Sequence, residues 1–152
     1  MNTALYRNPR AWRGRVVQVT LWVGVIAMAT IPLNAPPMTG ADMGVFIGGV
    51  ALMLAAAIAV EVYLRRYVVA IDQAPDGAVF TTLTTFTTMR RTHARGEIRY
   101  AGRRHDQSNI PGAPSVDNHW VSLHTPAGKF AYLVDVTPPA QIDDKALKQA
   151  LG

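Results

Sequence analysis

The chain has 152 residues, of which 49% are hydrophobic, and its 15 lysines and arginines outnumber its 10 acidic residues, which gives a formal net charge of +5. It contains no cysteine, which excludes disulfide bonds, thiolate metal sites and cysteine nucleophiles. No GxSxG elbow, HExxH zinc motif or glycine-rich phosphate loop is present either. These absences favour a protein that is not an enzyme and that holds no cofactor.

Residues 1–15 form a basic arm whose charged residues are all arginines. An arginine-rich segment that contains a tryptophan and directly precedes an apolar stretch is typical of the headgroup region of a membrane. We therefore predict that Trp12, Arg13 and Arg15 are interfacial anchors, and we place the arm in the cytoplasm.

Residues 16–64 are predicted to form a transmembrane helical hairpin, with helices at about 13–32 and 44–64. The second helix carries Glu61 as its only charge. At a rise of about 1.5 Å per residue, it is long enough for a hydrocarbon core of about 30 Å. The loop between the helices, 32–43, is rich in proline and has no basic residue. Because lysine and arginine collect on the cytoplasmic side, both termini are expected to face the cytoplasm of a bacterial inner membrane.

Three further anchors are predicted at the end of the second helix. Glu61 and Arg65 are four residues apart with the acid first, which is the favourable order for an ion pair on a helix. Arg66 follows directly. We expect these three residues to lie at the lipid headgroups in a structural role. A carboxylate inside a membrane span leaves a proton-transfer or partner-binding role open for Glu61.

Small residues recur along one face of the second helix. We predict that they form a helix-packing interface, which consists of Gly44, Gly48, Ala51, Ala55 and Ala59. Small side chains let a second helix approach closely, and van der Waals contact then drives association in lipid. The helix that packs here belongs either to another membrane protein or to the chain itself, in which case the first helix would approach through Gly24.

From about residue 65 the pattern changes from helical to alternating, so residues 65–152 are predicted to form a small cytoplasmic β-rich domain. The expected strands are residues 66–72, 79–92, 96–102, 117–125 and 130–136, and the expected C-terminal helix is residues 142–152. A polar loop over residues 103–117 connects the third and fourth strands. The predicted fold class is thus membrane α + β, a two-helix transmembrane hairpin followed by about five antiparallel strands and a short helix.

Basic residues are concentrated in one stretch of the β-rich domain. We predict that this stretch forms a cytoplasmic docking or lipid-headgroup surface, which consists of Arg90, Arg91, Arg95, Arg99, Tyr100, Arg103 and Arg104. A basic rim attracts anionic lipids by about 1 kcal/mol per residue near the membrane surface. The same arginines, with Tyr100 as an anchor, also fit an acidic patch on a protein partner. Nucleic acid is not an expected partner, because the chain has no recognised nucleic-acid-binding motif.

The chain contains 4 histidines, which raises the question of a metal site. His119 and His124 are five residues apart, and an odd spacing on a strand points two side chains to opposite faces. A zinc site also needs about four converging ligands. We therefore predict no metal site, and we interpret Asp117 and Asp135 near His119 as ordinary contacts of a hairpin.

The order of the predicted elements resembles that of a known group of proteins over most of the chain, and the sequence itself does so over about Arg65 to Thr88. The helical hairpin leads through basic residues into the strand RRYVVAID, a turn and a threonine-rich second strand, over Arg65 to Thr88. This order resembles the mitochondrial transmembrane-hairpin assembly factors of respiratory complexes and ATP synthase, and their bacterial relatives. The resemblance implies a scaffold without catalytic residues.

The leading hypothesis from the sequence is a non-enzymatic inner-membrane accessory subunit or assembly factor of a larger energy-transducing complex, respiratory or photosynthetic. Its expected partners are the subunits of that complex and anionic lipids. The alternative is a free-standing membrane module that binds anionic lipids or acts as a sensor. The first hypothesis predicts that other subunits co-purify with the protein from its native membrane, and the second predicts that they do not.

Overall fold

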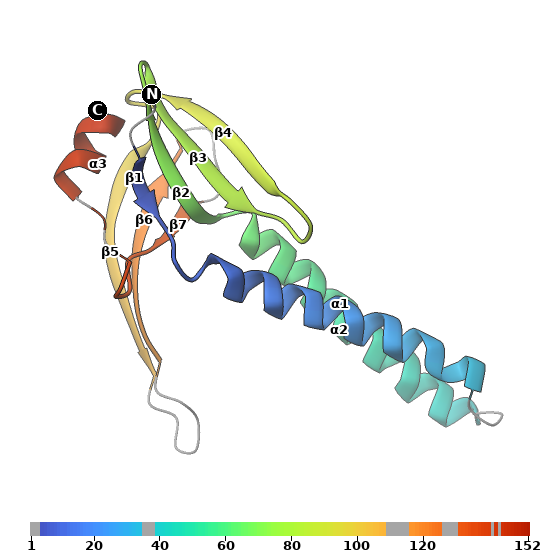
Figure 1. Ribbon diagram of the computed structural model, residues 1–152. Coiled ribbons are helices and arrows are strands. Elements are labelled where there is room, and N and C mark those ends of the chain that lie inside the picture. The colour runs from blue at the N-terminus through green and yellow to red at the C-terminus, as the bar shows by residue number, and fades with distance from the viewer. Residues whose placement is uncertain (1–3, 35–38, 109–115, 126–130, 141, 143) are drawn as a thin grey trace.

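The computed structural model describes residues 4–34, 39–108, 116–125, 131–140, 142 and 144–152. Figure 1 shows two long helices that pack side by side and project from one end of a β domain. Helix α1 (Ala11–Asn34) and helix α2 (Gly40–Leu64) are each long and apolar enough to cross a membrane, and only 6% of the most apolar window of each is buried. That exposure separates them from the core helices of soluble proteins, which are mostly buried.

Both helices extend beyond the predicted bounds. Helix α1 continues past Pro32, where the first helix was predicted to end. Helix α2 begins at Gly40 rather than at residue 44, because Thr39 and Asp42 form a capping box. The Thr39 hydroxyl accepts a hydrogen bond from the Asp42 amide, and the Asp42 carboxylate accepts one from the Thr39 amide, both at 3.3 Å. Such caps satisfy amides that the first helical turn leaves unpaired, and a count of apolar residues misses them.

In the described residues, seven strands form one sheet in the order β4-β3-β2-β7-β6-β5, with β1 paired to β2 beside this path. They are β1 (Ala4–Arg7), β2 (Tyr67–Ala74), β3 (Gly77–Leu83), β4 (Thr88–Ala94), β5 (Arg99–Ser108), β6 (Val116–His124) and β7 (Ala131–Asp135). The pairs are antiparallel except for β2 and β7, which are parallel. The predicted sheet of about five antiparallel strands is therefore wrong in strand number and in this parallel pair. Alternation reveals a strand but neither its partner nor its direction.

Two segments differ from their predicted structure. Residues 79–92, predicted as one strand, form the β3–β4 hairpin, whose turn is closed by hydrogen bonds of 3.0 Å from the amide and hydroxyl of Thr84 to the carbonyl oxygen of Thr87. Threonine hydroxyls stabilise turns without glycine or proline, so the sequence carries no obvious turn signal. Residues 103–108, predicted as loop, continue β5 opposite β6. Residues 109–115 of that loop lie outside the described residues.

The N-terminal arm contributes β1, a strand that is not among the predicted elements. Tyr6 is buried, and its phenol donates a hydrogen bond of 2.5 Å to the carbonyl oxygen of Asp135. Burial raises the pKa of Tyr6 well above its ordinary value. The Asn8 amide donates to the carbonyl oxygen of Val69 at 2.8 Å, which extends the contact with β2. Strand β1 leads into α1, and β2 follows α2. Because β1 and β2 are paired, the first residue of α1 and the last residue of α2 lie at the same end of the helical hairpin, next to the sheet.

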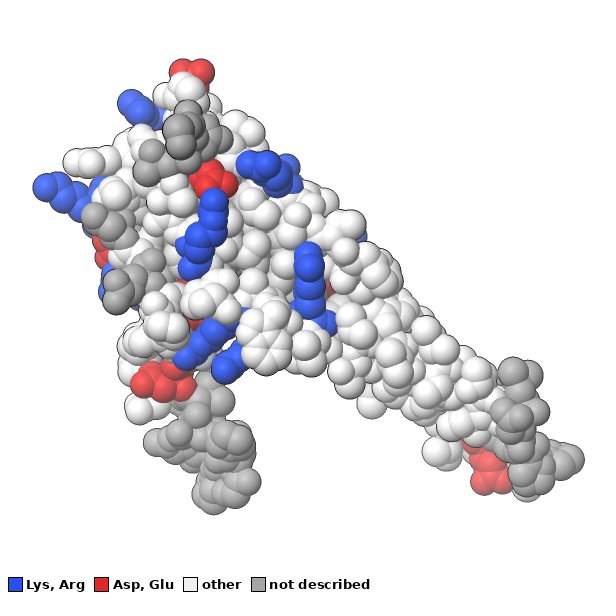
Figure 2. Space-filling model, in the orientation of Figure 1, with Lys and Arg blue, Asp and Glu red and all other residues white. Residues whose placement is uncertain are grey.

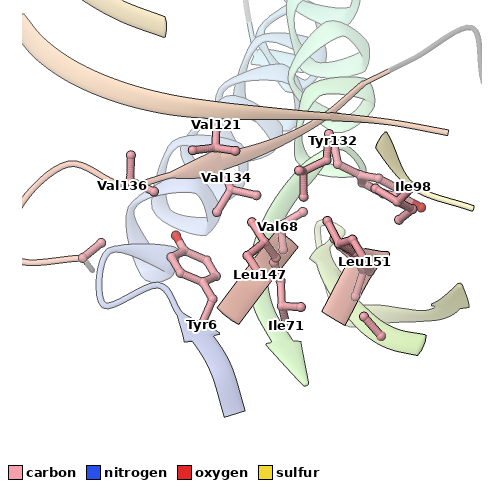
Figure 3. Packing of buried hydrophobic residues seen from close by; sticks show 14 residues of the cluster. Tyr6, Val68, Ile71, Ile98, Val121, Tyr132, Val134, Val136, Leu147 and Leu151 are labelled. Carbon is pink, nitrogen blue, oxygen red and sulfur yellow. The ribbon is translucent and has the colours of Figure 1, made fainter. Parts of the chain in front are cut away.

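The larger hydrophobic core lies between the strands and helix α3 (Asp144–Leu151). The presence of α3 confirms the predicted short C-terminal helix. Figure 3 shows Leu147 and Leu151 of α3 among the buried residues of the strands. Phe80 is fully buried, and its ring stacks on that of Tyr132 with a centroid distance of 5.3 Å. The apolar face of α3 thus covers the core, as its helical spacing of leucines indicates.

Candidate functional site

The helices enter the β domain at a place that we call the junction, which is formed by Trp12, Arg13, Arg15, Gln18, Glu61, Arg65, Arg66, Thr85 and Arg91. Figure 2 shows lysines and arginines over the β domain, whereas the visible face of the projecting hairpin is almost uncharged. Between Arg15 and Glu61 the only charged residue is Asp42. The charge of the surface therefore changes abruptly at the junction, which is typical of a boundary between an apolar phase and water.

The predicted interfacial anchors all lie at the junction. Trp12 is 60% exposed, and the guanidinium of Arg13 lies 5.8 Å from the centre of its ring. Arg15 is half-buried on α1. Arg65 and Arg66 follow the last residue of α2, and the Arg66 carbonyl oxygen accepts a hydrogen bond from the backbone of β7 at 2.9 Å. The end of α2 is therefore tied directly into the sheet.

Glu61 joins the helices to the β3–β4 turn. One oxygen of its carboxylate accepts a hydrogen bond of 3.2 Å from Arg65, which is the predicted ion pair. The other oxygen accepts hydrogen bonds from the amide and hydroxyl of Thr85, at 3.0 and 2.6 Å. The amide nitrogen of the fully buried Gln18 donates to the Thr85 hydroxyl at 3.2 Å and to the carbonyl oxygen of Ala57 at 3.1 Å. This cluster fixes the β domain against both helices, which gives Glu61 a structural role.

Three arginines line a cavity of about 370 Å³ at the junction. Arg65 and Arg66 come from the end of α2, and Arg91 comes from β4, where it lies opposite Phe80 of β3. Tyr132 of β7 forms part of the wall. Arginine presents a planar set of donors that matches phosphate and carboxylate groups. The cavity therefore has the chemistry to bind an anionic group, and we call it the arginine cavity.

The basic residues between positions 90 and 104 are divided among two strands and the short segment that joins them. Some lie on β4 and others on β5, and these two strands are the opposite edges of the sheet. Arg103 binds Asp144 of α3 at 2.8 Å, and this hydrogen bond raises the pKa of the Arg103 guanidinium above its ordinary value. The ring of Tyr100 lies 4.7 Å from the ammonium group of Lys148. Among the described residues, Arg91 is the member of the predicted set that lines the arginine cavity.

A second cavity at the junction, of about 290 Å³, is lined by aromatic rings and by Arg13. The rings of Tyr63 and Tyr67 stack at 5.8 Å, and the ring of Trp120 meets that of Tyr67 edge-on at 5.9 Å. The Tyr67 phenol donates a hydrogen bond of 3.1 Å to the Asp135 carboxylate, and burial together with that carboxylate raises the pKa of Tyr67. Aromatic rings with a polar edge are enriched where an apolar phase meets water, so this cavity fits an amphipathic ligand.

The predicted helix-packing interface, which we call the small-residue stripe, is exposed along its whole length: Gly44, Gly48, Ala51, Ala55 and Ala59. A Cβ added to either glycine of the stripe would meet no atom of a described residue within 4 Å. Helix α1 packs on another face of α2, where a Cβ on Gly49 would lie 3.2 Å from Met28 Cε and one on Gly24 would lie 2.5 Å from Met53 Cε. The sequence analysis left open whether the stripe packs against α1 or against a helix of another protein. Helix α1 does not cover the stripe.

Three side chains lie together on the β5–β6 hairpin: Asp117 and His119, whose proximity was predicted, and His105, which was not connected to them. His105 is directly opposite His119, and Asp117 lies two residues before His119. The Nε2 atoms of His105 and His119 lie 2.5 and 3.3 Å from the same oxygen of Asp117. Spacing along a single strand, from His119 to His124, does not reveal this cluster. It depends on the register between two strands, and the polar residues 103–108 would have to be recognised as a strand first.

The chain matches no model of a known protein family, and no curated protein is significantly similar to it. In the described part of the chain, the features that bear on function are the two cavities of the junction, the small-residue stripe and the histidine cluster.

Proposed function

We propose that this protein is a non-enzymatic accessory subunit or assembly factor of a larger membrane complex. In this proposal α1 and α2 cross the bacterial inner membrane, and both termini and the β domain lie in the cytoplasm. The long exposed apolar helices support membrane insertion, because such surfaces are unstable in water. The resemblance of the region around Arg65 to Thr88 favours an energy-transducing complex, respiratory or photosynthetic, and its subunits as partners.

The observation that carries this proposal is the uncovered small-residue stripe of α2. In lipid, helices associate through close packing rather than through the hydrophobic effect, and small side chains allow that approach. The hairpin does not use the stripe for its own packing, because α1 contacts α2 around Gly49 and Met53 instead. The partner that fits the stripe is an apolar transmembrane helix of another subunit.

The stripe is tested by replacing Gly48 and Ala55 together with leucine. The added side chains should hold a partner helix away, so we expect at least a roughly tenfold loss of the co-purified complex, about 1.4 kcal/mol. The tagged protein is extracted from native membranes in mild detergent, and its companions are quantified by mass spectrometry. The matched control places leucine at Ala27 and Ala29, which are exposed on α1. Unchanged companions in the stripe variant would contradict this interface.

A second candidate function, the binding of anionic lipid headgroups, is favoured by the arginine cavity. Arg65, Arg66 and Arg91 face one space at the boundary where the helices would leave the membrane. An arginine near such a surface attracts anionic lipid by about 1 kcal/mol. Recovery of the wild-type protein with phosphatidylglycerol but without protein companions would favour this function over the first.

For the arginine cavity, we expect replacement of Arg65, Arg66 and Arg91 with glutamine to weaken phosphatidylglycerol binding by about 3 kcal/mol, or roughly a hundredfold. Short-chain phosphatidylglycerol is titrated into delipidated protein in neutral detergent, and bound lipid is counted by native mass spectrometry. The control variant removes the same charge by substitution of three arginines outside the cavity, namely Arg95, Arg99 and Arg104. An equal loss of lipid in both variants would indicate a diffuse charge effect and contradict a defined site.

A further inference from the structure

The cluster on the β5–β6 hairpin groups three side chains that can each offer one ligand atom to a metal ion. The imidazole rings of His105 and His119 are stacked with a centroid distance of 4.4 Å and an interplanar angle of 6°. One oxygen of Asp117 lies within hydrogen-bond distance of the His105 Nε2 atom and 3.3 Å from that of His119. One ligand atom from each of the three residues therefore lies within 4.8 Å of the others.

We propose that His105, Asp117 and His119 bind a divalent first-row transition-metal ion, for which zinc is the best match. Imidazole nitrogen and carboxylate oxygen are ligands of zinc, at about 2.0–2.2 Å, and this places neighbouring ligands of a tetrahedral ion about 3.3 Å apart. The separation of Asp117 and His119 already has that value, 3.3 Å. The separation of Asp117 and His105 is 2.5 Å, so their side chains need to open by about 1 Å.

The backbone that carries these ligands is held in place by its neighbours. The amide of His119 donates a hydrogen bond of 2.9 Å to the Thr137 hydroxyl, and its carbonyl oxygen accepts one of 2.8 Å from Val136. The antiparallel ladder with β5 keeps His105 opposite His119. Binding of the ion thus requires rotation of side chains and no rearrangement of the sheet, so little conformational entropy is lost.

The ligand set does not suit magnesium or calcium. Magnesium and calcium prefer sites built from several oxygen ligands, and this cluster offers one carboxylate and two imidazoles. All three side chains are exposed to solvent, with exposed fractions of 49%, 61% and 42% for His105, Asp117 and His119. Three protein ligands leave at least one coordination position for water or for a group on a partner. A buried structural zinc site would be closed by a fourth protein ligand.

Calorimetric titration of Zn²⁺ into the full-length protein tests the site. The protein carries no histidine tag and is stripped with a chelator in detergent. We expect saturable binding of one ion per chain and no binding of Mg²⁺. Replacement of His105 or His119 with alanine should weaken binding at least roughly tenfold, because each variant loses one of three ligands. The variants are compared with wild type by circular dichroism to verify that the fold is intact.

The matched control is His124→Ala, since His124 is an exposed histidine of the same strand, an odd number of residues from His119. It should bind Zn²⁺ as the wild type does. Absence of saturable Zn²⁺ binding by the wild type would overturn the proposal, and so would an equal loss of affinity in the His124 variant. Binding of Mg²⁺ as strong as that of Zn²⁺ would contradict the assigned ligand chemistry. These results are independent of whether a membrane complex binds the helices.

Discussion

Substitution of Phe80 with alanine is expected to lower the free energy of unfolding of the β domain by about 3–5 kcal/mol. Phe80 is fully buried at the centre of the core, where its ring stacks on Tyr132 and meets His93 edge-on at 5.4 Å. The loss is a large part of the roughly 5–15 kcal/mol that stabilises a typical domain. Chemical denaturation of the full-length protein in detergent, followed by tryptophan fluorescence, measures the change.

The chain offers a matched control for this substitution. Phe86 lies between β3 and β4 and is 86% exposed, so its removal creates no cavity. We expect Phe86→Ala to change the free energy of unfolding by less than about 0.5 kcal/mol. Similar losses for the two phenylalanines would contradict the packing of the core around Phe80.

The second large loss of stability is expected for substitution of Gly77, where β3 begins next to the end of β4. Gly77 lies opposite Ala94, and a Cβ atom on Gly77 would overlap the carbonyl oxygen of His93 and lie 3.0 Å from Ala94 Cα. Backbone atoms cannot rotate away as a side chain can. Gly77→Ala should therefore destabilise the β domain by about 3 kcal/mol and loosen the edge strand β4. Because β4 carries Arg91, the variant should also lose anion binding in the arginine cavity.

Hydrogen exchange of the β4 amides in the full-length protein measures this loosening, and denaturation gives its free energy. Gly44→Ala is the control, since a Cβ on Gly44 has no described atom within 4 Å and alanine favours a helix. Slow exchange in β4 of the Gly77 variant, as in the wild type, would show that the sheet accommodates a side chain there.

The helices were the most predictable part of the fold because their signal is local. A long apolar run and the Glu61–Arg65 spacing are visible without knowledge of any distant residue. Strand β1 has no such signal. It is only four residues long, and it is held by contacts such as that between Tyr6 and Asp135, which are 129 residues apart. The turn at Thr84 escaped prediction for a different reason, since β-branched residues continue on both sides of it.

The residues of the candidate sites also differ in whether the local sequence predicts their position. Arg65 and Arg66 are adjacent in sequence to the end of α2, so their place at the junction follows from the helix itself. Arg91 joins them only through the pairing of β3 with β4, and its sequence neighbours pointed instead to a separate basic surface. His105 and His119 meet only through the register of β5 with β6. Alternation fixes the face of one strand and says nothing about what lies opposite.

The pairing of β1 with β2 has a consequence for biogenesis. In the proposed topology, β1 leaves the ribosome before the two helices and stays without its neighbour β2 until both helices have been synthesised and inserted. A chain in which only one helix crossed the bilayer would leave β1 and β2 on opposite sides, and Tyr6 could never reach Asp135. Completion of the sheet then acts as a check on insertion. Misinserted chains keep an unpaired strand edge, the kind of surface that chaperones and quality-control proteases recognise.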